Sequence, residues 1–225
     1  MEHGRLLFFV RNPERDEVKT RLAATVGQNV ARDLYRCFML DMLSAFEGAG
    51  FPLTICYSPK DALDDLTGIV GEGYGFQRQY GEGLGEKMKN GMTDSFAQGF
   101  DPVIVIGSDI PDLPVAFIRE SFAALQTYDS VIGPALDGGY YLIGFKQEGF
   151  LPEAFQGIGW GTGTVLTRTL DILGANQRTA YLLPSLRDID TFEDLKVFFE
   201  KHKHTPQSLR TMTYLNDSQI LEGFG

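Results

Sequence analysis

Acidic residues occur after one apolar run and at alternate positions of a later segment, where their carboxylates could bind a metal ion. Asp109 comes soon after the run 103–106 (VIVI), and Asp188 and Asp190 alternate in the segment 187–195 (RDIDTFEDL). Side chains at alternate positions of an extended segment point the same way, and like charges held together are costly unless a cation neutralises them. A carboxylate at a strand end can hold a divalent cation that bridges nucleotide phosphates. We therefore interpret Asp109 as a metal ligand.

Two other acids near these positions are better explained as helix caps. Asp112 precedes Pro114, a residue that fits the first turn of a helix, so we expect Asp112 to cap that helix. Thr191 and Asp194 have the spacing of a capping box before an apolar run. The capping box leaves the two preceding aspartates available for other roles.

One stretch of this acidic chain is locally basic, and it lies near the N-terminus. Residues 1–40 hold seven basic and five acidic residues, a net charge of +2, whereas the whole chain carries −10. The loop 11–21 (RNPERDEVKTR) contains Arg11, Lys19 and Arg21, and guanidinium forks and a lysine ammonium suit phosphate oxygens. We predict that Lys19 and Arg21 contact the phosphates of a ligand. A solvated loop balanced by its own acidic residues is the alternative, with about even weight.

Two glycine-rich segments allow a ligand to approach the backbone closely. In 133–141 (GPALDGGYY) the paired glycines permit such an approach, although Asp-Gly is also the commonest hairpin signal. In 80–88 (YGEGLGEKM) the glycine spacing matches neither a Walker loop nor a Rossmann fingerprint. Gly85 opens a helix whose N-terminal amides can meet a polar ligand. Taken alone, a flexible loop is the simpler interpretation of this second segment.

Apolar runs and helical spacings predict the elements that must position these groups. Strands are predicted at residues 6–10, 53–57, 76–80, 103–106, 130–132, 140–145 and 179–183. Helices are predicted at residues 28–48, 84–98, 114–126, 162–173 and 191–201. Alternating strands and helices, with continuously apolar strands, indicate a three-layer α/β/α domain whose mostly parallel sheet is covered on both faces. We predict this domain over residues 1–204, with 205–225 as a C-terminal arm packed on the domain or on a partner chain.

Composition excludes several classes of protein. The chain has 225 residues, 43% hydrophobic and 22% charged, which is typical of a globular domain. Its negative charge argues against nucleic-acid binding, and no apolar run reaches the roughly 18–20 residues of a membrane span. The three histidines lie near the chain ends, which argues against a serine–histidine or multi-histidine metal site. Two cysteines without a framework are predicted to stay unpaired in a reducing cytoplasm.

The motifs resemble, in their order, those of a known bacterial family. They read VKTRLA, YGEGLGEKM, VIGSDIPDL, IGPALDGGYYLIG, GIGWGTGTVL and LRDIDTFEDL. The family is one of GT-A-type glycosyltransferases of unknown function, similar in turn to 2-phospholactate guanylyltransferase and the molybdenum-cofactor guanylyltransferases. The resemblance spans residues 5–200 and implies a nucleotide-diphospho-sugar transferase fold, a single Rossmann-like domain. It also implies that Asp109, Asp188 and Asp190 hold Mg²⁺ or Mn²⁺.

The resemblance further implies a site divided between a nucleotide and an acceptor. It assigns nucleotide contacts to the first loop with Arg11, Lys19 and Arg21, to Ser108 and to the region of Gly85. It assigns two acceptor-side loops, one with Asp137, Gly138 and Gly139 and the other with Trp160, Thr162 and Thr164. The family's first loop usually reads Lys-x-Pro-x-x-Gly. This sequence has Arg11 for the lysine, which keeps the charge but not the geometry, and Asp16 for the glycine.

Three functions are compatible with these features. The leading hypothesis is metal-dependent transfer of a sugar from a nucleotide-activated donor, with Lys19 and Arg21 adding positive charge and Asp137 orienting or deprotonating an acceptor hydroxyl. The alternative is a nucleotidyltransferase that joins a nucleoside triphosphate to a phosphorylated small molecule. The third is a non-catalytic nucleotide-binding protein. The expected partners are a nucleotide or nucleotide sugar and a small-molecule acceptor, and a homodimer is compatible with the C-terminal arm.

Overall fold

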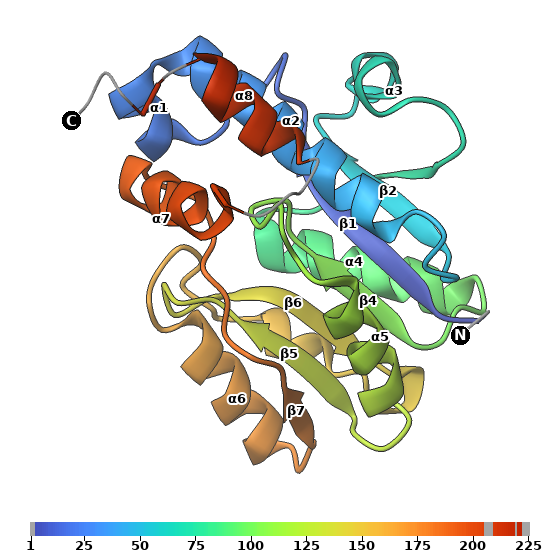
Figure 1. The fold of residues 1–225 in the computed structure, drawn as a ribbon. Helices are drawn as coiled ribbons and strands as arrows, with labels where there is room; N and C mark the ends of the chain where they lie inside the picture. Colours follow the sequence, from blue (N-terminus) through green and yellow to red (C-terminus); the bar gives the residue numbers. More distant parts are fainter. Residues whose placement is uncertain (1–2, 205–208, 219, 222–225) are drawn as a thin grey trace.

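A seven-stranded β-sheet forms the centre of the molecule (Figure 1). The computed structural model describes residues 3–204, 209–218 and 220–221. The strands lie in the order β3-β2-β1-β4-β6-β5-β7 across the sheet. Their bounds are β1 (Arg5–Arg11), β2 (Leu53–Ser58), β3 (Gly75–Arg78), β4 (Val103–Ile106), β5 (Ser130–Pro134), β6 (Tyr140–Phe145) and β7 (Ala180–Leu182).

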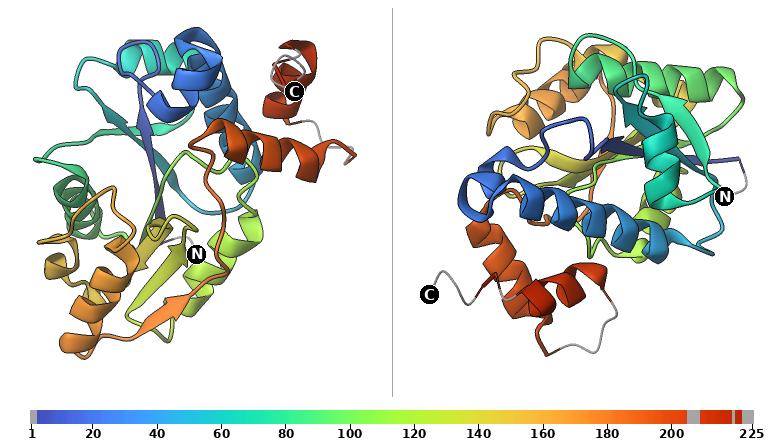
Figure 2. Two further views of the ribbon diagram at one scale, coloured as in Figure 1. Left: turned by 90° about the vertical axis from the view of Figure 1, so that its left-hand side faces the viewer. Right: turned by 90° about the horizontal axis from the view of Figure 1, so that it is seen from above.

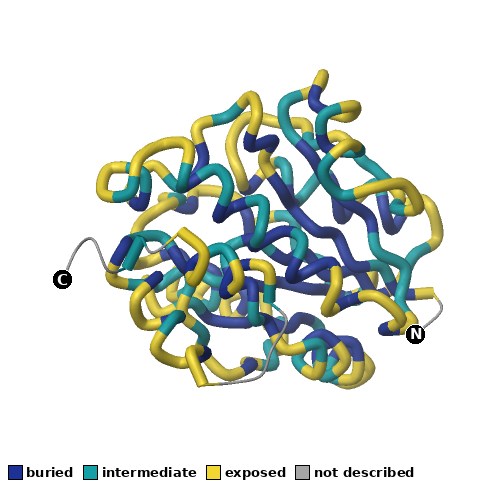
Figure 3. Tube along the Cα trace, turned by 45° about the horizontal axis from the view of Figure 1, so that its top comes forward, coloured by how far each residue is buried: buried dark blue, intermediate teal, exposed yellow. Residues whose placement is uncertain are grey.

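The sheet is mostly parallel, as the sequence predicts. Within the described residues, β6 is the strand that runs antiparallel to its neighbours, β4 and β5, and the other paired strands are parallel. The central strands β1, β4 and β5 are buried along almost their whole length, and the sheet forms the buried centre of the molecule (Figure 3). Because both faces of these strands are covered, their sequences are continuously apolar rather than alternating.

Helices cover both faces of the sheet (Figure 2). On one face, the apolar sides of α2 (Gln28–Phe46), α5 (Val115–Ala124) and α7 (Phe192–His202) share one hydrophobic cluster with the strands. On the other face, a second cluster contains residues of α4 (Leu84–Ala97), α6 (Val165–Ala175) and the short 3-10 helix η2 (Pro152–Phe155). The fold is the single three-layer α/β/α domain that the sequence predicts.

Five short helices among the described residues were not predicted from the sequence. They are α1 (Thr20–Val26), α3 (Leu63–Val70), α8 (Arg210–Ser218) and the 3-10 helices η1 (Gln147–Gly149) and η2. Helices of this length contain too few apolar repeats to show a clear periodicity. Of these, α1 matters most for the site, because it follows directly on the basic loop after β1.

The C-terminal helix α8 packs on α2. The buried Asp41 carboxylate accepts hydrogen bonds from the backbone N–H groups of Arg210 (2.7 Å) and Thr211 (2.9 Å), at the start of α8. Residues 205–208, 219 and 222–225 of the predicted arm lie outside the described residues. Among the helices that are described, none combines the length and hydropathy needed to cross a bilayer.

Candidate active site

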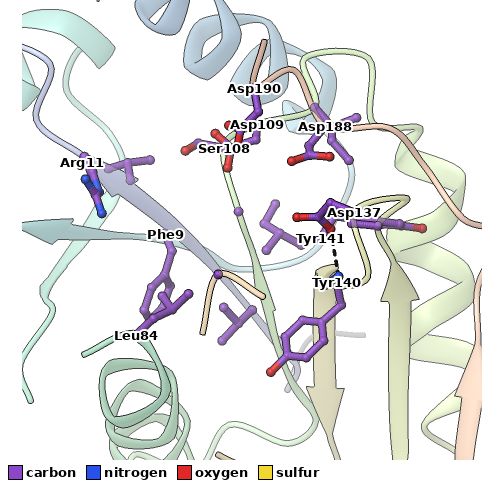
Figure 4. Close-up of a pocket in the computed structure, with 18 of the residues that line it drawn as sticks. Phe9, Arg11, Leu84, Ser108, Asp109, Asp137, Tyr140, Tyr141, Asp188 and Asp190 are labelled. Carbon is purple, nitrogen blue, oxygen red and sulfur yellow. Dashed lines mark hydrogen bonds between the residues drawn. The ribbon is translucent and has the colours of Figure 1, made fainter. Parts of the chain in front are cut away.

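A cavity of about 460 Å³ opens at the edge of the sheet where β1 and β4 end (Figure 4). Its lining combines the loop after β1, the loop after β4, the turn between β5 and β6, and the segment before α7. Most of the residues that the sequence analysis placed in the site line this cavity: Arg11, Lys19, Arg21, Ser108, Asp109, Asp137, Gly139, Trp160, Thr162, Asp188 and Asp190.

A backbone contact brings the segment 188–190 to Asp109. The N–H of Ile189 donates a hydrogen bond of 3.0 Å to the carbonyl oxygen of Asp109. Slightly earlier, Leu186 forms a parallel bridge with Ala135, the residue after β5. The segment therefore runs along the ends of β5 and β4. The buried Ile189 anchors it there, and the aspartates on either side of Ile189 line the cavity.

The Lys19 ammonium lies between Asp109 and Asp190. Its Nζ is 2.5 Å from Oδ1 of Asp109 and 3.1 Å from Oδ1 of Asp190. The Lys19 side chain is only 4% exposed, and its backbone φ of 50° lies in the left-handed region that few non-glycine residues adopt. Burial on its own would lower the pKa of Lys19, but the two carboxylates outweigh it and raise the pKa above its ordinary value. Lys19 is therefore a buried, charged counter-ion for the two acids.

The arginines of the same loop are placed differently. Arg21 is 69% exposed and its Nη1 lies 3.6 Å from Oδ2 of Asp190. Arg11, the last residue of β1, lines the cavity (Figure 4). Arg15 does not line the cavity. It forms an ion pair of 2.7 Å with Asp61, just before α3. The guanidinium groups at the cavity are therefore those of Arg11 and Arg21.

Two further acidic residues of the cavity, Asp137 and Asp188, lie on the side of Asp109 and Asp190 that is away from Arg11 (Figure 4). The Asp137 carboxylate accepts a hydrogen bond of 2.8 Å from the N–H of Gly139, which holds it on the β5–β6 turn. Burial, followed by repulsion from Asp137 and Asp190, raises the pKa of Asp188 to about 6. The negative charge of a carboxylate with such a pKa is poorly compensated by its surroundings. The group can therefore exchange a proton near neutral pH.

The cavity as a whole is acidic. Its charged lining comprises the cations Arg11, Lys19 and Arg21 and the acids Glu17, Asp109, Asp137, Asp188 and Asp190. The sequence analysis expected the basic loop to attract an anion, but acids outnumber cations in the assembled cavity. An anionic ligand therefore needs additional positive charge to bind here.

The chemistry of the donor atoms suits a divalent cation. Mg²⁺ and Mn²⁺ prefer carboxylate oxygens. Burial, followed by repulsion from Asp137 and Asp190, raises the pKa of Asp188, and a nearby cation would offset both effects. In the part of the chain that the structure describes, no three acidic, histidine or cysteine side chains form a group able to hold an ion. Mg²⁺, however, often uses one or two carboxylates together with water and substrate phosphates. Of the three predicted ligands, Asp109 and Asp190 form a pair of carboxylates that suits such a site, with Lys19 between them. Asp188 lines the same cavity.

Tyr35 supports the cavity where β1 and β4 end, and the sequence analysis missed it. Its hydroxyl oxygen accepts a hydrogen bond of 3.1 Å from the N–H of Arg11 and is 2.7 Å from the Oγ of Ser108. Burial, followed by the nearby Asp109 carboxylate, raises the pKa of Tyr35 to about 12. Tyr35 lies on α2, so its position in the sequence indicates only a helix face. The contact with the ends of β1 and β4 arises from the packing of α2 on the sheet.

Gly85 and Gly138, which the sequence analysis placed in the site, do not line the cavity. A Cβ on Gly85 would lie 2.6 Å from the carbonyl oxygen of Phe155 and 2.7 Å from the Trp160 ring. Gly138 has a φ of 90°, and its Cβ would lie 2.2 Å from the carbonyl oxygen of Gly163. Both positions require glycine because neighbouring chain passes close by. Because Gly85 has no side chain, the Trp160 ring can pack against its backbone. Trp160 itself lines the cavity.

Asp112 does not cap a helix, contrary to the expectation from the sequence. The cap residue of α5 is Pro114, without a side-chain hydrogen bond. The Asp112 carboxylate instead lies 2.9 Å from Nε2 of His202 and 2.5 Å from Nζ of Lys201, at the end of α7. His202, expected outside the core because of its position near the chain end, is buried and packs against the ring of Phe198. Asp112 joins the loop after β4 to α7.

The predicted capping box at the start of α7 is confirmed. The Thr191 side chain accepts a hydrogen bond from the N–H of Asp194 (3.2 Å), and the Asp194 carboxylate accepts one from the N–H of Thr191 (3.0 Å). The Asp194 carboxylate also pairs with Arg187 at 2.9 Å. These bonds close the turn that directly follows the aspartates of the site.

Comparison with known proteins shows which family has this arrangement. A family model described as an uncharacterized protein conserved in bacteria, DUF2064, matches residues 42–162. The chain belongs to this family. A crystal structure from Desulfovibrio desulfuricans G20, of a protein provisionally named a nucleotide-diphospho-sugar transferase, is 39% identical to this DUF2064 protein. The two structures match with a TM-score of 0.93 over 99% of this chain and 98% of that chain.

This DUF2064 protein also has more distant relatives. The 2-phospho-L-lactate guanylyltransferase of Methanocaldococcus sp. (strain FS406-22) is 24% identical over 147 residues, 63% of this chain and 60% of that protein. The chain thus spans 60% of the length of the curated relatives it matches. A cytidylyltransferase structure from Leptospira borgpetersenii is 11% identical, with a TM-score of 0.56 over 99% of this chain and 95% of that chain. This last likeness shows the shared fold alone.

Proposed function

We propose that this protein is a divalent-cation-dependent transferase that moves a sugar from a nucleotide-activated donor to a hydroxyl-bearing small molecule. The proposal rests on the distribution of charge in the cavity. The cations of the lining are Arg11, at the end of β1, and Lys19 and Arg21, at the start of α1, whereas the β5–β6 turn and the segment before α7 contribute the carboxylates of Asp137 and Asp188. A diphosphate suits the first side, and an uncharged hydroxyl compound suits the second.

On the donor side, Arg11 and Arg21 bind phosphate oxygens. Their guanidinium groups offer paired donors that match two oxygens at once. Before the donor binds, Lys19 neutralises Asp109 and Asp190, so that these carboxylates do not repel the approaching donor. The aspartates of the cavity would hold a divalent cation, which would supply further positive charge to the departing diphosphate.

On the acceptor side, Asp137 orients the hydroxyl and accepts its proton. The hydroxyl oxygen forms a bond to the anomeric carbon of the sugar, the bond from that carbon to the phosphate oxygen breaks, and the nucleoside diphosphate leaves. Asp137 is suited to this role because Gly139 fixes its carboxylate on the turn. Tyr140 and Trp160, whose rings meet edge to face at 6.1 Å, form an aromatic wall beside it.

The first test is binding and turnover with a panel of nucleotide sugars, with and without Mn²⁺. A ligand at about 100 times its Kd should stabilise the native protein by about 2.7 kcal/mol, which a thermal-shift screen detects. With the donor that binds, we expect release of nucleoside diphosphate when a hydroxyl acceptor is added. Asp137→Asn should lower kcat by about 10²–10⁴-fold and leave donor binding unchanged.

Asp171→Asn provides a matched control, because Asp171 is an exposed aspartate of α6 outside the cavity. It should turn over like the parent protein. Equal kcat for Asp137→Asn and the parent would contradict the role of Asp137. If no nucleotide sugar of the panel binds, the proposal of a glycosyl donor is wrong.

Nucleotidyl transfer is the second candidate, and the guanylyltransferase relatives favour it. In that reaction a phosphate oxygen of the acceptor attacks the α-phosphate of a nucleoside triphosphate, and pyrophosphate leaves. Release of pyrophosphate from a triphosphate donor would support this candidate, whereas release of nucleoside diphosphate supports glycosyl transfer. Nucleotide binding without turnover of any donor would support the non-catalytic hypothesis.

A further inference from the structure

We propose that Lys19 is a built-in competitor for the divalent cation, so that metal binds Asp109 and Asp190 tightly only when nucleotide phosphates draw the lysine ammonium away. The inference rests on the proposed function, because it concerns the cation and the nucleotide of that site. It gives Lys19 a second role beside the phosphate contact that the sequence predicts. Lys19 regulates access of the metal to two of its ligands.

The first observation is that the ammonium already occupies the carboxylate pair. Lys19 Nζ lies 2.5 Å and 3.1 Å from the Oδ1 atoms of Asp109 and Asp190. Mg²⁺ would bind the same kind of oxygen at about 2.0–2.1 Å. A divalent ion and an ammonium that share these oxygens would repel each other strongly at such distances. Metal binding to this pair therefore requires the ammonium to move.

The second observation is that the three side chains differ in exposure. The Lys19 side chain is 4% exposed, whereas those of Asp109 and Asp190 are 46% and 40% exposed. The ammonium thus approaches the carboxylates from the protein side and leaves their cavity side open. An incoming cation with its nucleotide can reach the carboxylates without first unfolding any element of the sheet.

The third observation is that a second cationic side chain lies beside the same carboxylates. Lys19 is the cap residue of α1, and Nη1 of Arg21 lies 3.6 Å from Oδ2 of Asp190. Arg21, two residues further along, is largely exposed and lines the same cavity. Phosphates bound by Arg21 therefore lie within reach of a displaced Lys19 ammonium.

It follows that metal and nucleotide should bind cooperatively. The phosphates compensate the charge of Lys19 once it has left the aspartates, and the metal compensates the aspartates that Lys19 has left. Such coupling is reciprocal, so nucleotide should tighten metal binding by the same factor by which metal tightens nucleotide binding. Without nucleotide, the parent protein should bind Mn²⁺ weakly.

The test measures Mn²⁺ binding to the protein without nucleotide, by electron paramagnetic resonance of the free ion and by calorimetry. Lys19→Met removes the ammonium and keeps an apolar stem of similar length. We expect it to bind Mn²⁺ at least about tenfold more tightly than the parent. Lys60→Met, which removes an exposed lysine that does not line the cavity, should bind Mn²⁺ like the parent. If Lys19 were only a phosphate ligand, its loss would leave Mn²⁺ affinity unchanged.

Unchanged or weaker Mn²⁺ binding by folded Lys19→Met would overturn the inference. If Lys19→Met does not fold without metal, the same comparison is made in the Asp109→Asn background, where Lys19 has one carboxylate fewer to neutralise. There the loss of Lys19 should again tighten Mn²⁺ binding, and no change would overturn the inference equally. Failure of nucleotide to bind at all, together with tighter Mn²⁺ binding by Lys19→Met, would count against the proposed function and not against the competition by Lys19.

Discussion

The N–H of Ile189 donates a 3.0 Å hydrogen bond to the carbonyl oxygen of Asp109, and this one contact assembles the acidic side of the cavity. The two residues belong to segments that are far apart in the sequence. Because Ile189 is buried beside the loop after β4, the aspartates on either side of it line the same cavity as Asp109. A site made of several strand ends is typical of open α/β sheets.

Arg21 and Lys19 should respond differently to charge reversal. Arg21→Glu is expected to weaken nucleotide binding by about tenfold or more with little change in melting temperature, because Arg21 is 69% exposed. Lys19→Glu should instead lower the melting temperature sharply, because it places a third carboxylate beside Asp109 and Asp190 in a buried position. Calorimetry and thermal unfolding measure the two effects. Arg119→Glu, at an exposed position of α5, is the control for net charge.

Gly85→Ala should disturb the site through Trp160. The new Cβ would lie 2.6–2.7 Å from the Phe155 carbonyl oxygen and the Trp160 ring, so one of them must move. We expect a loss of about 1–3 kcal/mol in the free energy of unfolding and a shift in the fluorescence of Trp160, the single tryptophan. Gly174→Ala, on α6 with open space around its Cβ, should be neutral or stabilising by up to about 1 kcal/mol. Identical fluorescence of the Gly85→Ala variant and the parent would contradict the packing described.

The capping box of α7 should contribute stability that depends on pH. Burial favours a higher pKa for Asp194, but hydrogen bonds from Thr191 and Arg187 prevail, and the pKa is lowered from 3.8. The ionised carboxylate is therefore favoured by folding. Its stabilisation is present above the unfolded pKa and is lost as pH falls through the lower folded value.

Asp194→Asn should accordingly destabilise the protein by about 1 kcal/mol at pH 7 and much less near pH 3. Urea unfolding at the two pH values measures the difference. Asp171→Asn, which changes an exposed aspartate of α6, should show no such dependence. A cost for Asp194→Asn that is the same at both pH values would show that the carboxylate charge plays no part in the cap.

Asp112 should stabilise the fold through His202 and not through α5. Asp112→Ala leaves the buried His202 without its 2.9 Å partner and should cost about 1–3 kcal/mol. A double-mutant cycle with His202→Ala should give a coupling of about 0.5–3 kcal/mol. Additive effects of the two substitutions would contradict the pairing. Nucleotide binding should be unchanged, because neither residue lines the cavity.

The sequence by itself determined the three layers of this protein and the types of side chain in its candidate site. Apolar runs such as 103–106 predict buried strands because a strand covered on both faces must be apolar throughout. The capping box of Thr191 and Asp194 is likewise visible, because it joins residues only three positions apart. Patterns of this kind are local, and the chain encodes them directly.

Only the tertiary structure decided which groups meet. The parallel pairing of β1 with β4 brings together the segments that follow these strands, and Lys19 there meets Asp109 and Asp190. Helix packing places Tyr35 against Ser108 and pairs Asp112 with His202. These contacts join residues that are 73 or more positions apart in the sequence, so their geometry depends on strand order, register and helix packing. The same residue types in another strand order would place the lysine elsewhere, and the acids would need a different cation.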